Sequence, residues 1–406
     1  MNDNLFSIDN FQINNLKDRQ PKHLSEKFEK IFLEIKKDIK NNKKTLNILD
    51  DKFKLNFKTN DLKKFKKFKT IVIIGMGGSI LGTEAIYNFL NIKIKKKVYF
   101  FNDIDENKIS SFKRKENLSK ILFIIVSKSG NTIETLSNVF TLNIIKKNAK
   151  NIILISEKKN NLLFSLSKKF NLFHIQHKDY IGGRYSVLSE VGVVPALLMG
   201  INISKLRSNI LDSMKGKNKI ILKNSTIKFA SLLNSKRFNN LVFLNYSPEL
   251  EKLMYWCQQL IAESLGKNSK GFFPVISSVP KDHHSLLQLY LDGPNDKLFN
   301  IFSIEKKIKE KEKVYINKNA GINSFLNKKN LVSVKNAQRQ ALIKAFTKKN
   351  IPLREFKIKK INEKVLGKLF SYFILETVIT AKLSNLNPFN QPAVEQVKIY
   401  TKKLLT

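Results

Sequence analysis

The chain has 406 residues, of which 42% are hydrophobic, enough to fill the cores of two or three globular domains. No apolar run approaches the ~20 residues that a membrane-spanning helix needs, and the opening MNDNLFSIDN has neither a basic n-region nor an apolar h-region, so we expect a cytoplasmic protein without a membrane partner. The single cysteine, Cys257, excludes an internal disulfide, and no Cys/His cluster has zinc spacing, so we expect no structural metal.

The formal net charge is +41, which would suit a protein that binds a nucleic-acid backbone. However, lysine far outnumbers arginine, the basic residues are spread from end to end, and Asn and Ile are equally overused, as biased codon usage would produce. We therefore expect no specific nucleic-acid partner. A positive surface would still steer anionic metabolites toward a cleft.

Residues 1–68 alternate short amphipathic patterns with lysine runs, and we expect a helical N-terminal arm. The next stretch, TIVIIGMGGSILG, changes from an apolar strand at 71–74 to a glycine turn and then to a helix. It is not a dinucleotide fingerprint, because G-x-G-x-x-G would require glycine at Ile80. This is a strand, a glycine turn and a helix start.

A second turn of this kind lies in ILFIIVSKSGNTIET, residues 121–135. Six apolar residues are followed by a hydroxyl-rich turn, and a helical pattern begins at Ile133. Backbone N–H groups, short hydroxyls and the positive end of a helix would meet there, which is the chemistry that a phosphate monoester needs. The alternative is an ordinary polar loop with a Ser/Thr cap.

Further strands are expected at 98–101 and 151–155, with a helix over 133–147. This alternation predicts a first domain over 69–200 with a parallel sheet that is covered on both faces. Ligands of such sheets bind beyond the carboxyl ends of the strands. Both turns should therefore converge on one site.

A second α/β domain is expected over 201–386. Its predicted strands lie at 241–245, 272–276, 299–304 and 351–356, and its helices at 203–236, 250–265, 334–349 and on to 383. The lysine-rich stretch 306–329 is interpreted as a loop or insertion. In the last segment, 387–406, NPFNQPA interrupts the pattern and a C-terminal helix over 394–405 follows.

Several polar residues stand in apolar surroundings. Gln259 and Glu263 are four residues apart in MYWCQQLIAESLGK and so share one helix face, where a partly desolvated carboxylate suits a general base. A Glu near a helix end is, however, more often solvated. Arg184 in GGRYS is flanked by glycines that allow close backbone approach. His283 and His284 follow VPKD, and histidines near apolar residues are usually structural.

Six ordered motifs together resemble the glucose-6-phosphate isomerase family: GMGGSILG, SKSGNTIET, GGRYSVLS, QQLIAESLGK, DHHSLLQ and PFNQPAVEQVK. The resemblance implies an α/β fold with two sugar-isomerase (SIS) domains, each a doubly wound, flavodoxin-like parallel sheet. It also implies reversible isomerisation of glucose 6-phosphate to fructose 6-phosphate through ring opening and a cis-enediol(ate), in glycolysis and gluconeogenesis. No cofactor is implied. The expected assembly is a homodimer in which each active site borrows a histidine from the other chain.

The resemblance also implies roles for individual residues. Glu263 would move the proton between C2 and C1, Arg184 would stand beside the enediolate oxygen, and His284 would open the ring with help from Lys398. Gln259 and Gln391 would hold sugar hydroxyls. The phosphate would be bound by Ser127, Lys128, Ser129 and Thr132, in a pocket that is also lined by Gly78 and Ser79.

Three departures bear on these roles. The loop is SKSGNT where many members have SKTFTT, and PFNQPA differs from the usual PFDQ with G. His283 stands where glutamine is common, so either imidazole could be the ring-opening acid; the spacing of SLLQ favours His284.

Two rival functions share the phosphate loop. A dual phosphoglucose/phosphomannose isomerase also has SGNT, but the set GGRYS, ES-GK and HHSLLQ argues against it. A non-catalytic SIS regulator that senses phosphosugars would keep the Ser127 loop, but it would not need Glu263, His284 and Lys398 together.

Overall fold

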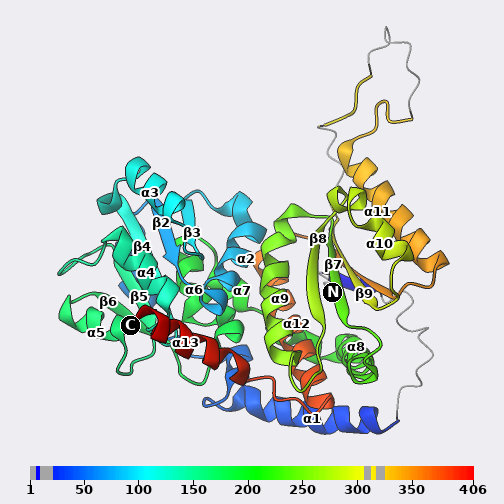
Figure 1. The fold of residues 1–406 in the computed structure, drawn as a ribbon, viewed down its shortest axis with the longest axis horizontal. Helices are drawn as coiled ribbons and strands as arrows, with labels where there is room; N and C mark the ends of the chain where they lie inside the picture. The colour runs from blue at the N-terminus through cyan, green and yellow to red at the C-terminus, as the bar shows by residue number, and fades with distance from the viewer. Residues whose placement is uncertain (1–5, 10–21, 306–311, 317–324) are drawn as a thin grey trace.

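The computed structural model describes residues 6–9, 22–305, 312–316 and 325–406, and these form two lobes that lie side by side (Figure 1). Each lobe is built on one five-stranded sheet, and helices α2 (Leu81–Leu90) and α9 (Glu251–Leu265) pack against each other between the lobes. Among the described residues, no helix is long and apolar enough to cross a membrane.

The first sheet is entirely parallel and has the order β3-β2-β4-β5-β6. Its strands are β2 (Thr70–Ile74), β3 (Lys97–Phe101), β4 (Ile121–Val126), β5 (Ile152–Ser156) and β6 (Phe173–Gln176). The order reverses between β2 and β4, which is the flavodoxin-like switch point where such folds bind ligands. The helices of this lobe are α2, α3 (Glu106–Lys115), α4 (Ile133–Leu142), α5 (Leu162–Lys169) and α6 (Glu190–Leu198).

Apolar side chains cover both faces of this sheet. Ile71 and Ile73 join one core cluster, whereas Val72 and Ile74 join another on the opposite face. Successive strand residues point to opposite faces, so a continuous β-branched run can bury both sides only in a sheet that helices cover twice. The predicted doubly wound sheet is therefore confirmed.

The second sheet has the order β1-β10-β9-β7-β8, with β1 antiparallel and the others parallel. Its strands are β1 (Phe6–Asp9), β7 (Asn240–Asn245), β8 (Phe273–Ser278), β9 (Lys297–Ile304) and β10 (Leu353–Ile358). Its helices are α7 (Ile203–Arg207), α8 (Gly216–Ser235), α10 (Leu287–Asp292), α11 (Leu331–Lys348) and α12 (Glu363–Leu383), together with α9. Helix α13 (Glu395–Leu405) leaves this lobe and crosses to the first (Figure 1).

The N-terminal region is only partly helical. Helix α1 (Lys22–Lys40) packs against α8 and α12, and a short 3₁₀ helix, η1 (Thr45–Leu49), follows it. The strand β1, however, pairs with β10, so the expectation of a helical arm was wrong for these four residues. The remaining predicted helix at 1–5 and 10–21, and the predicted insertion at 306–311 and 317–324, lie outside the described residues.

Two predicted helices ended differently. The helix expected over 133–147 stops at Leu142, because Asn143 adopts the left-handed conformation (φ 51°) that terminates helices. The helix expected over 203–236 is divided into α7 and α8 by a 3₁₀ turn that follows Asn209, also left-handed (φ 55°).

We propose a domain boundary near residue 200, since α6 packs on α2 and α7 packs on α12.

Candidate active site

A cavity of about 380 Å³ lies at the carboxyl edge of the first sheet. Both turns predicted to converge border it, and α9 and the segment before α13 complete its walls. The lining residues are Met76, Gly77, Gly78, Ser79, Lys128, Ser129, Thr132, Glu157, Gly183, Arg184, Gln259, Glu263, Gln391 and Lys398. Of the predicted site residues, only Ser127 and His284 are absent from this set.

The glycine turn forms one wall. After β2 the chain enters a short 3₁₀ turn, Gly77–Ser79, in which Gly77 is left-handed (φ 50°). A Cβ atom at Gly78 would lie 2.2 Å from the carbonyl carbon of Gly183, far inside van der Waals contact. Glycine at position 78 therefore allows this turn and the GGRYS segment to pack backbone against backbone.

The hydroxyl-rich turn forms another wall. The Ser127 Oγ lies 2.8 Å from the Thr132 Oγ1 and accepts a 3.1 Å hydrogen bond from the Gly130 N–H. Ser127 is only 1% exposed, so its side chain fixes the shape of the turn from beneath the lining residues. Thr132 is the N-cap of α4, and the positive end of that helix thus borders the cavity.

Lys128 supplies a positive charge on this wall. Its Nζ donates to the Asp179 carbonyl at 2.7 Å and lies 3.7 Å from the Glu157 carboxylate. Burial lowers the pKa of Lys128, although Glu157 opposes that shift. Sequence reasoning missed Glu157; the available signal was its position directly after the strand β5, at the carboxyl edge.

Arg184 lies at the centre of a buried hydrogen-bond network and is 3% exposed. Its Nε donates to the Ser264 Oγ at 2.9 Å, and its Nη1 donates at 3.0 Å both to the Glu263 carboxylate and to the Gln391 side-chain oxygen. Its Nη2 donates to the Pro388 and Asn390 carbonyls. The guanidinium is held in one orientation, with its charge beside Glu263.

Glu263 points from α9 into the same cavity. Its Oε1 accepts a 2.9 Å hydrogen bond from the Gln259 amide, one turn earlier on the helix, and its Oε2 accepts from Arg184. The side chain is 27% exposed, so it is partly desolvated and still reachable by a small molecule. A positioned carboxylate beside a fixed cation can move a carbon-bound proton and stabilise the resulting oxyanion.

The C-terminal segment closes the cavity from the second lobe. Gln391 contacts Arg184, and Lys398 on α13 lines the cavity while its Nζ lies 3.1 Å from the Glu395 carboxylate. Segments that are distant in the sequence thus meet at this edge: the two turns of the first lobe, the GGRYS segment, α9, and the chain around α13.

The two histidines lie elsewhere, on the 3₁₀ turn Lys281–His284 of the second lobe. The His283 Nε2 lies 3.1 Å from the Tyr246 hydroxyl, and burial together with the neighbouring His284 lowers the pKa of His283. His284 is exposed. Neither ring is among the residues that line the cavity formed by this chain.

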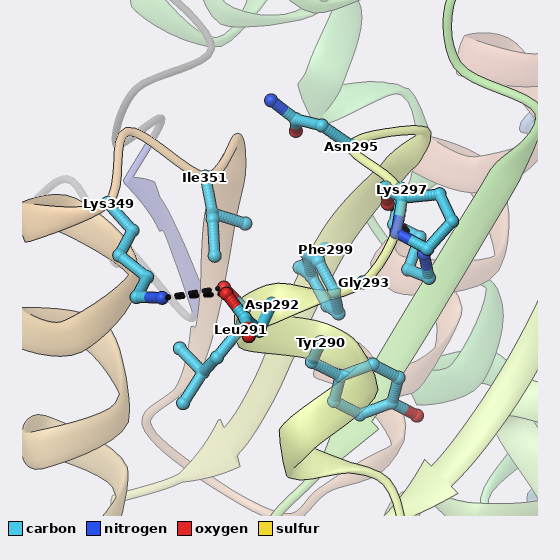
Figure 2. Close-up of a pocket in the computed structure, with 10 residues that line it drawn as sticks. Tyr290, Leu291, Asp292, Gly293, Asn295, Lys297, Phe299, Lys349 and Ile351 are labelled. Atoms are coloured by element: carbon cyan, nitrogen blue, oxygen red, sulfur yellow. Dashed lines mark hydrogen bonds and ion pairs between the residues drawn. The ribbon is translucent and has the colours of Figure 1, made fainter.

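A second hollow, of about 330 Å³, lies at the amino ends of β9 and β10 (Figure 2). Figure 2 shows the Lys349 side chain reaching toward Asp292, at 3.6 Å. This edge is opposite to the one where parallel sheets bind ligands.

Across the described ranges, no group of three or more His, Cys, Asp and Glu side chains could hold a metal ion.

Comparison with known proteins identifies similar chains. The family model described as phosphoglucose isomerase matches residues 1–406. The chain is 34% identical over 359 residues to the glucose-6-phosphate isomerase of Methanocaldococcus jannaschii, which covers 83% of this chain and 85% of that protein. It is 30% identical over 368 residues to the glucose-6-phosphate isomerase of Mycoplasmopsis pulmonis, with 84% of each protein covered.

Two solved structures show the same fold. A hypothetical protein from Thermus thermophilus superposes with a TM-score of 0.81 at 24% identity and covers 99% of this chain and 100% of its own. A glucose-6-phosphate isomerase from Chlamydia trachomatis gives a TM-score of 0.69 at 20% identity, covering 84% of this chain and 71% of that one.

Proposed function

The chain belongs to the phosphoglucose isomerase family, and on that premise we propose that it interconverts glucose 6-phosphate and fructose 6-phosphate at the cavity built around Glu263. The observation that carries this proposal is the placement of the Glu263 carboxylate between the Arg184 guanidinium, at 3.0 Å, and the Gln259 amide, at 2.9 Å. A phosphate-type turn lines the same cavity.

In the proposed complex, the phosphate of the sugar binds to the Ser129 and Thr132 side chains, to Lys128 and to the end of α4. Ser127 acts through Thr132, whose hydroxyl it contacts. Gly78 and Ser79 line the same cavity. The phosphate takes no part in the reaction, so this binding energy serves to position the carbons that react.

Glu263 is the proposed base. It removes the proton from C2 of the open-chain aldose and returns it to C1, and the negative charge that develops on the oxygen between these steps faces Arg184. Gln259 and Gln391 each contact a member of the Glu263–Arg184 pair and are placed to bind sugar hydroxyls. Every step uses groups of the protein and substrate, so the proposal includes no cofactor.

The ring-opening acid is proposed to be His284 of a second subunit, assisted by Lys398. Two observations support an acid supplied from another chain: His284 is exposed, and it does not line the cavity of its own chain. His283 is the weaker candidate, because its Nε2 is engaged by Tyr246. A homodimer with shared sites follows from this proposal.

The rival functions are less well supported. The relatives named above are isomerases, and the cavity holds a carboxylate base paired with a fixed cation, Glu263 with Arg184, which a non-catalytic phosphosugar regulator would not require. A dual phosphoglucose/phosphomannose isomerase is not favoured by the matching family model. The proposed reaction belongs to glycolysis and gluconeogenesis, and we place it in the cytoplasm for that reason.

A coupled assay that detects glucose 6-phosphate formed from fructose 6-phosphate tests the activity directly. The variant Glu263→Gln should lower kcat by about 10²-fold or more, because an amide cannot accept the proton. Glu251→Gln, at the start of the same helix and away from the cavity, is the matched control and should keep kcat within about twofold. No conversion by the purified wild-type chain would overturn the proposal.

A further inference from the structure

A third cavity, of about 730 Å³, lies between α1, the loop that contains Tyr180, and residues 385–389. We call it the α1 hollow. On α1 its lining residues are Lys27, Ile31, Glu34 and Asp38, whose spacing places them on one face of the helix. Its volume falls within the range of ligand sites, roughly 300–1,000 Å³.

The α1 hollow has the electrostatic character of an anion site. Lysines line it at positions 27, 43, 44 and 382, against two carboxylates, and one of these, Glu34, is already paired with Lys382 at 2.6 Å. The Lys27 Nζ donates to the Leu383 carbonyl at 2.9 Å and to the Asn385 side-chain oxygen at 2.6 Å. Burial and, as the smaller cause, the neighbouring Lys270 lower the pKa of Lys27, so the ammonium is destabilised there and a bound anion would stabilise it.

The walls of the hollow are partly apolar. Ile31 and Leu386 are buried, and the half-buried rings of Tyr180 and Phe389 also line the cavity. Burial, together with nearby carboxylates, raises the pKa of Tyr180 to about 12, so its hydroxyl remains a hydrogen-bond donor. A ligand that fits both features carries negative charge at one end and an aromatic group at the other.

The hollow shares a wall with the active site. Pro388 lines the hollow, and its carbonyl accepts hydrogen bonds from Arg184 and, at 2.8 Å, from the Tyr185 hydroxyl. Phe389 also lines the hollow, and its ring centroid lies 5.6 Å from that of Tyr185. A ligand that displaces this segment must therefore alter the position of the Arg184 guanidinium.

We propose that the α1 hollow is a regulatory site for an organic polyanion with an aromatic body, of the nucleoside phosphate class. The anionic end would contact Lys27, Lys43 and Lys44, and the aromatic end would lie against Tyr180 and Phe389. Occupancy changes turnover through Pro388 and Arg184, and does not compete with the sugar phosphate.

The test uses adenosine diphosphate as the probe, with calorimetry on the full-length chain in the presence of saturating, equilibrated sugar phosphates. We expect one ADP per chain. The double variant Lys43→Glu, Lys44→Glu should weaken its binding by about tenfold or more, since both side chains are exposed and their reversal removes attraction without disturbing the core. In wild type, saturating ADP should change kcat by about twofold or more, and this effect should vanish in the double variant.

Two controls separate the site from the general positive charge of the protein. Lys36→Glu with Lys37→Glu makes the same charge change on exposed positions of α1 that do not line the hollow, and ADP binding should stay within about twofold of wild type. Inorganic pyrophosphate should bind about tenfold more weakly than ADP, because it has no group for the two rings. Competition between ADP and sugar phosphate, equal losses in both double variants, or equal binding of pyrophosphate would each overturn the proposal. The ADP-binding measurement tests the α1 hollow as a binding site independently of the proposed isomerase activity.

Discussion

Replacing Arg184 with lysine keeps the positive charge of the active site but removes its geometry. The guanidinium donates in three directions: to Ser264 through Nε, to Glu263 and Gln391 through Nη1, and to two backbone carbonyls through Nη2. A lysine ammonium has three donors on a single nitrogen and cannot span these acceptors. The ammonium can remain beside Glu263 only if it no longer donates hydrogen bonds to the two backbone carbonyls.

The size of the stability loss in Arg184→Lys depends on which acceptors lose their hydrogen-bond donor. Ser264 and the Pro388 carbonyl keep the Tyr185 hydroxyl, at 2.8 Å in both cases, so they are not left unsatisfied. We therefore expect the free energy of unfolding to fall by about 3 kcal/mol, near the lower end for losing two hydrogen bonds from a charged donor. Because the cation is no longer fixed beside the developing oxyanion, kcat should fall by about 10²-fold, equivalent to ~2.7 kcal/mol.

The assay is fructose 6-phosphate turnover at a temperature where urea titration shows every variant to be folded. Arg207→Lys is the matched control: Arg207 is half-buried and donates to the Leu188, Ile48 and Asp50 carbonyls, but it does not line the active-site cavity. It should lose comparable stability and keep kcat within about threefold. If Arg184→Lys retains near wild-type kcat, or if the two variants lose kcat equally, then the orientation of Arg184 does not drive catalysis.

Three further predictions concern the phosphate turn, the shared site and pH. Ser127→Ala with Thr132→Ala should raise KM for fructose 6-phosphate and weaken inhibition by inorganic phosphate together, by about tenfold, and unchanged values of both would remove this turn from the site. His284→Ala subunits mixed with Glu263→Gln subunits should regain activity, because a hybrid dimer contains one site with both groups; no recovery despite proven subunit exchange would place base and acid on one chain. Burial lowers the pKa of His177 to about 4, so its contribution to stability is present above the ordinary histidine pKa of 6.5 and is lost as the pH falls toward 4. His177→Gln should flatten the decline in unfolding free energy over that interval by up to about 1.4 kcal/mol per pH unit, and identical pH profiles would contradict this.

The sequence indicated most of the two sheets, because their strands are local signals. The run at 71–74 is apolar, β-branched and bounded by glycine, and it became β2 with one residue added. The strand Phe6–Asp9 had no such signal: it has only four residues, and its partner β10 lies at the other end of the chain. Nothing in residues 6–9 alone distinguishes an edge strand from a loop.

The same contrast holds in the active site. The turn at Ser127 and the Gln259–Glu263 pair could be read from spacing within one segment, and the structure places Thr132, Gln259 and Glu263 around one cavity. The partners that fix Arg184 could not be predicted in this way, because Ser264 lies 80 positions away and the Pro388 carbonyl 204 positions away. The GGRYS motif marked Arg184 as a candidate, and the structure places it at the cavity, but its orientation depends on long-range packing.

The antiparallel pairing of β1 with β10 has a consequence for how the protein is made. Asp9 and Lys357, which form an ion pair across this edge, are separated by 348 positions. At synthesis rates of about 5–20 residues per second, β1 leaves the ribosome roughly 20 to 70 seconds before its partner strand exists. The first lobe can fold during that interval, but the edge of the second sheet remains an unpaired template. We therefore expect nascent chains that are arrested between β9 and β10 to bind chaperones or to aggregate. The second lobe should reach its native state only after β10 has emerged.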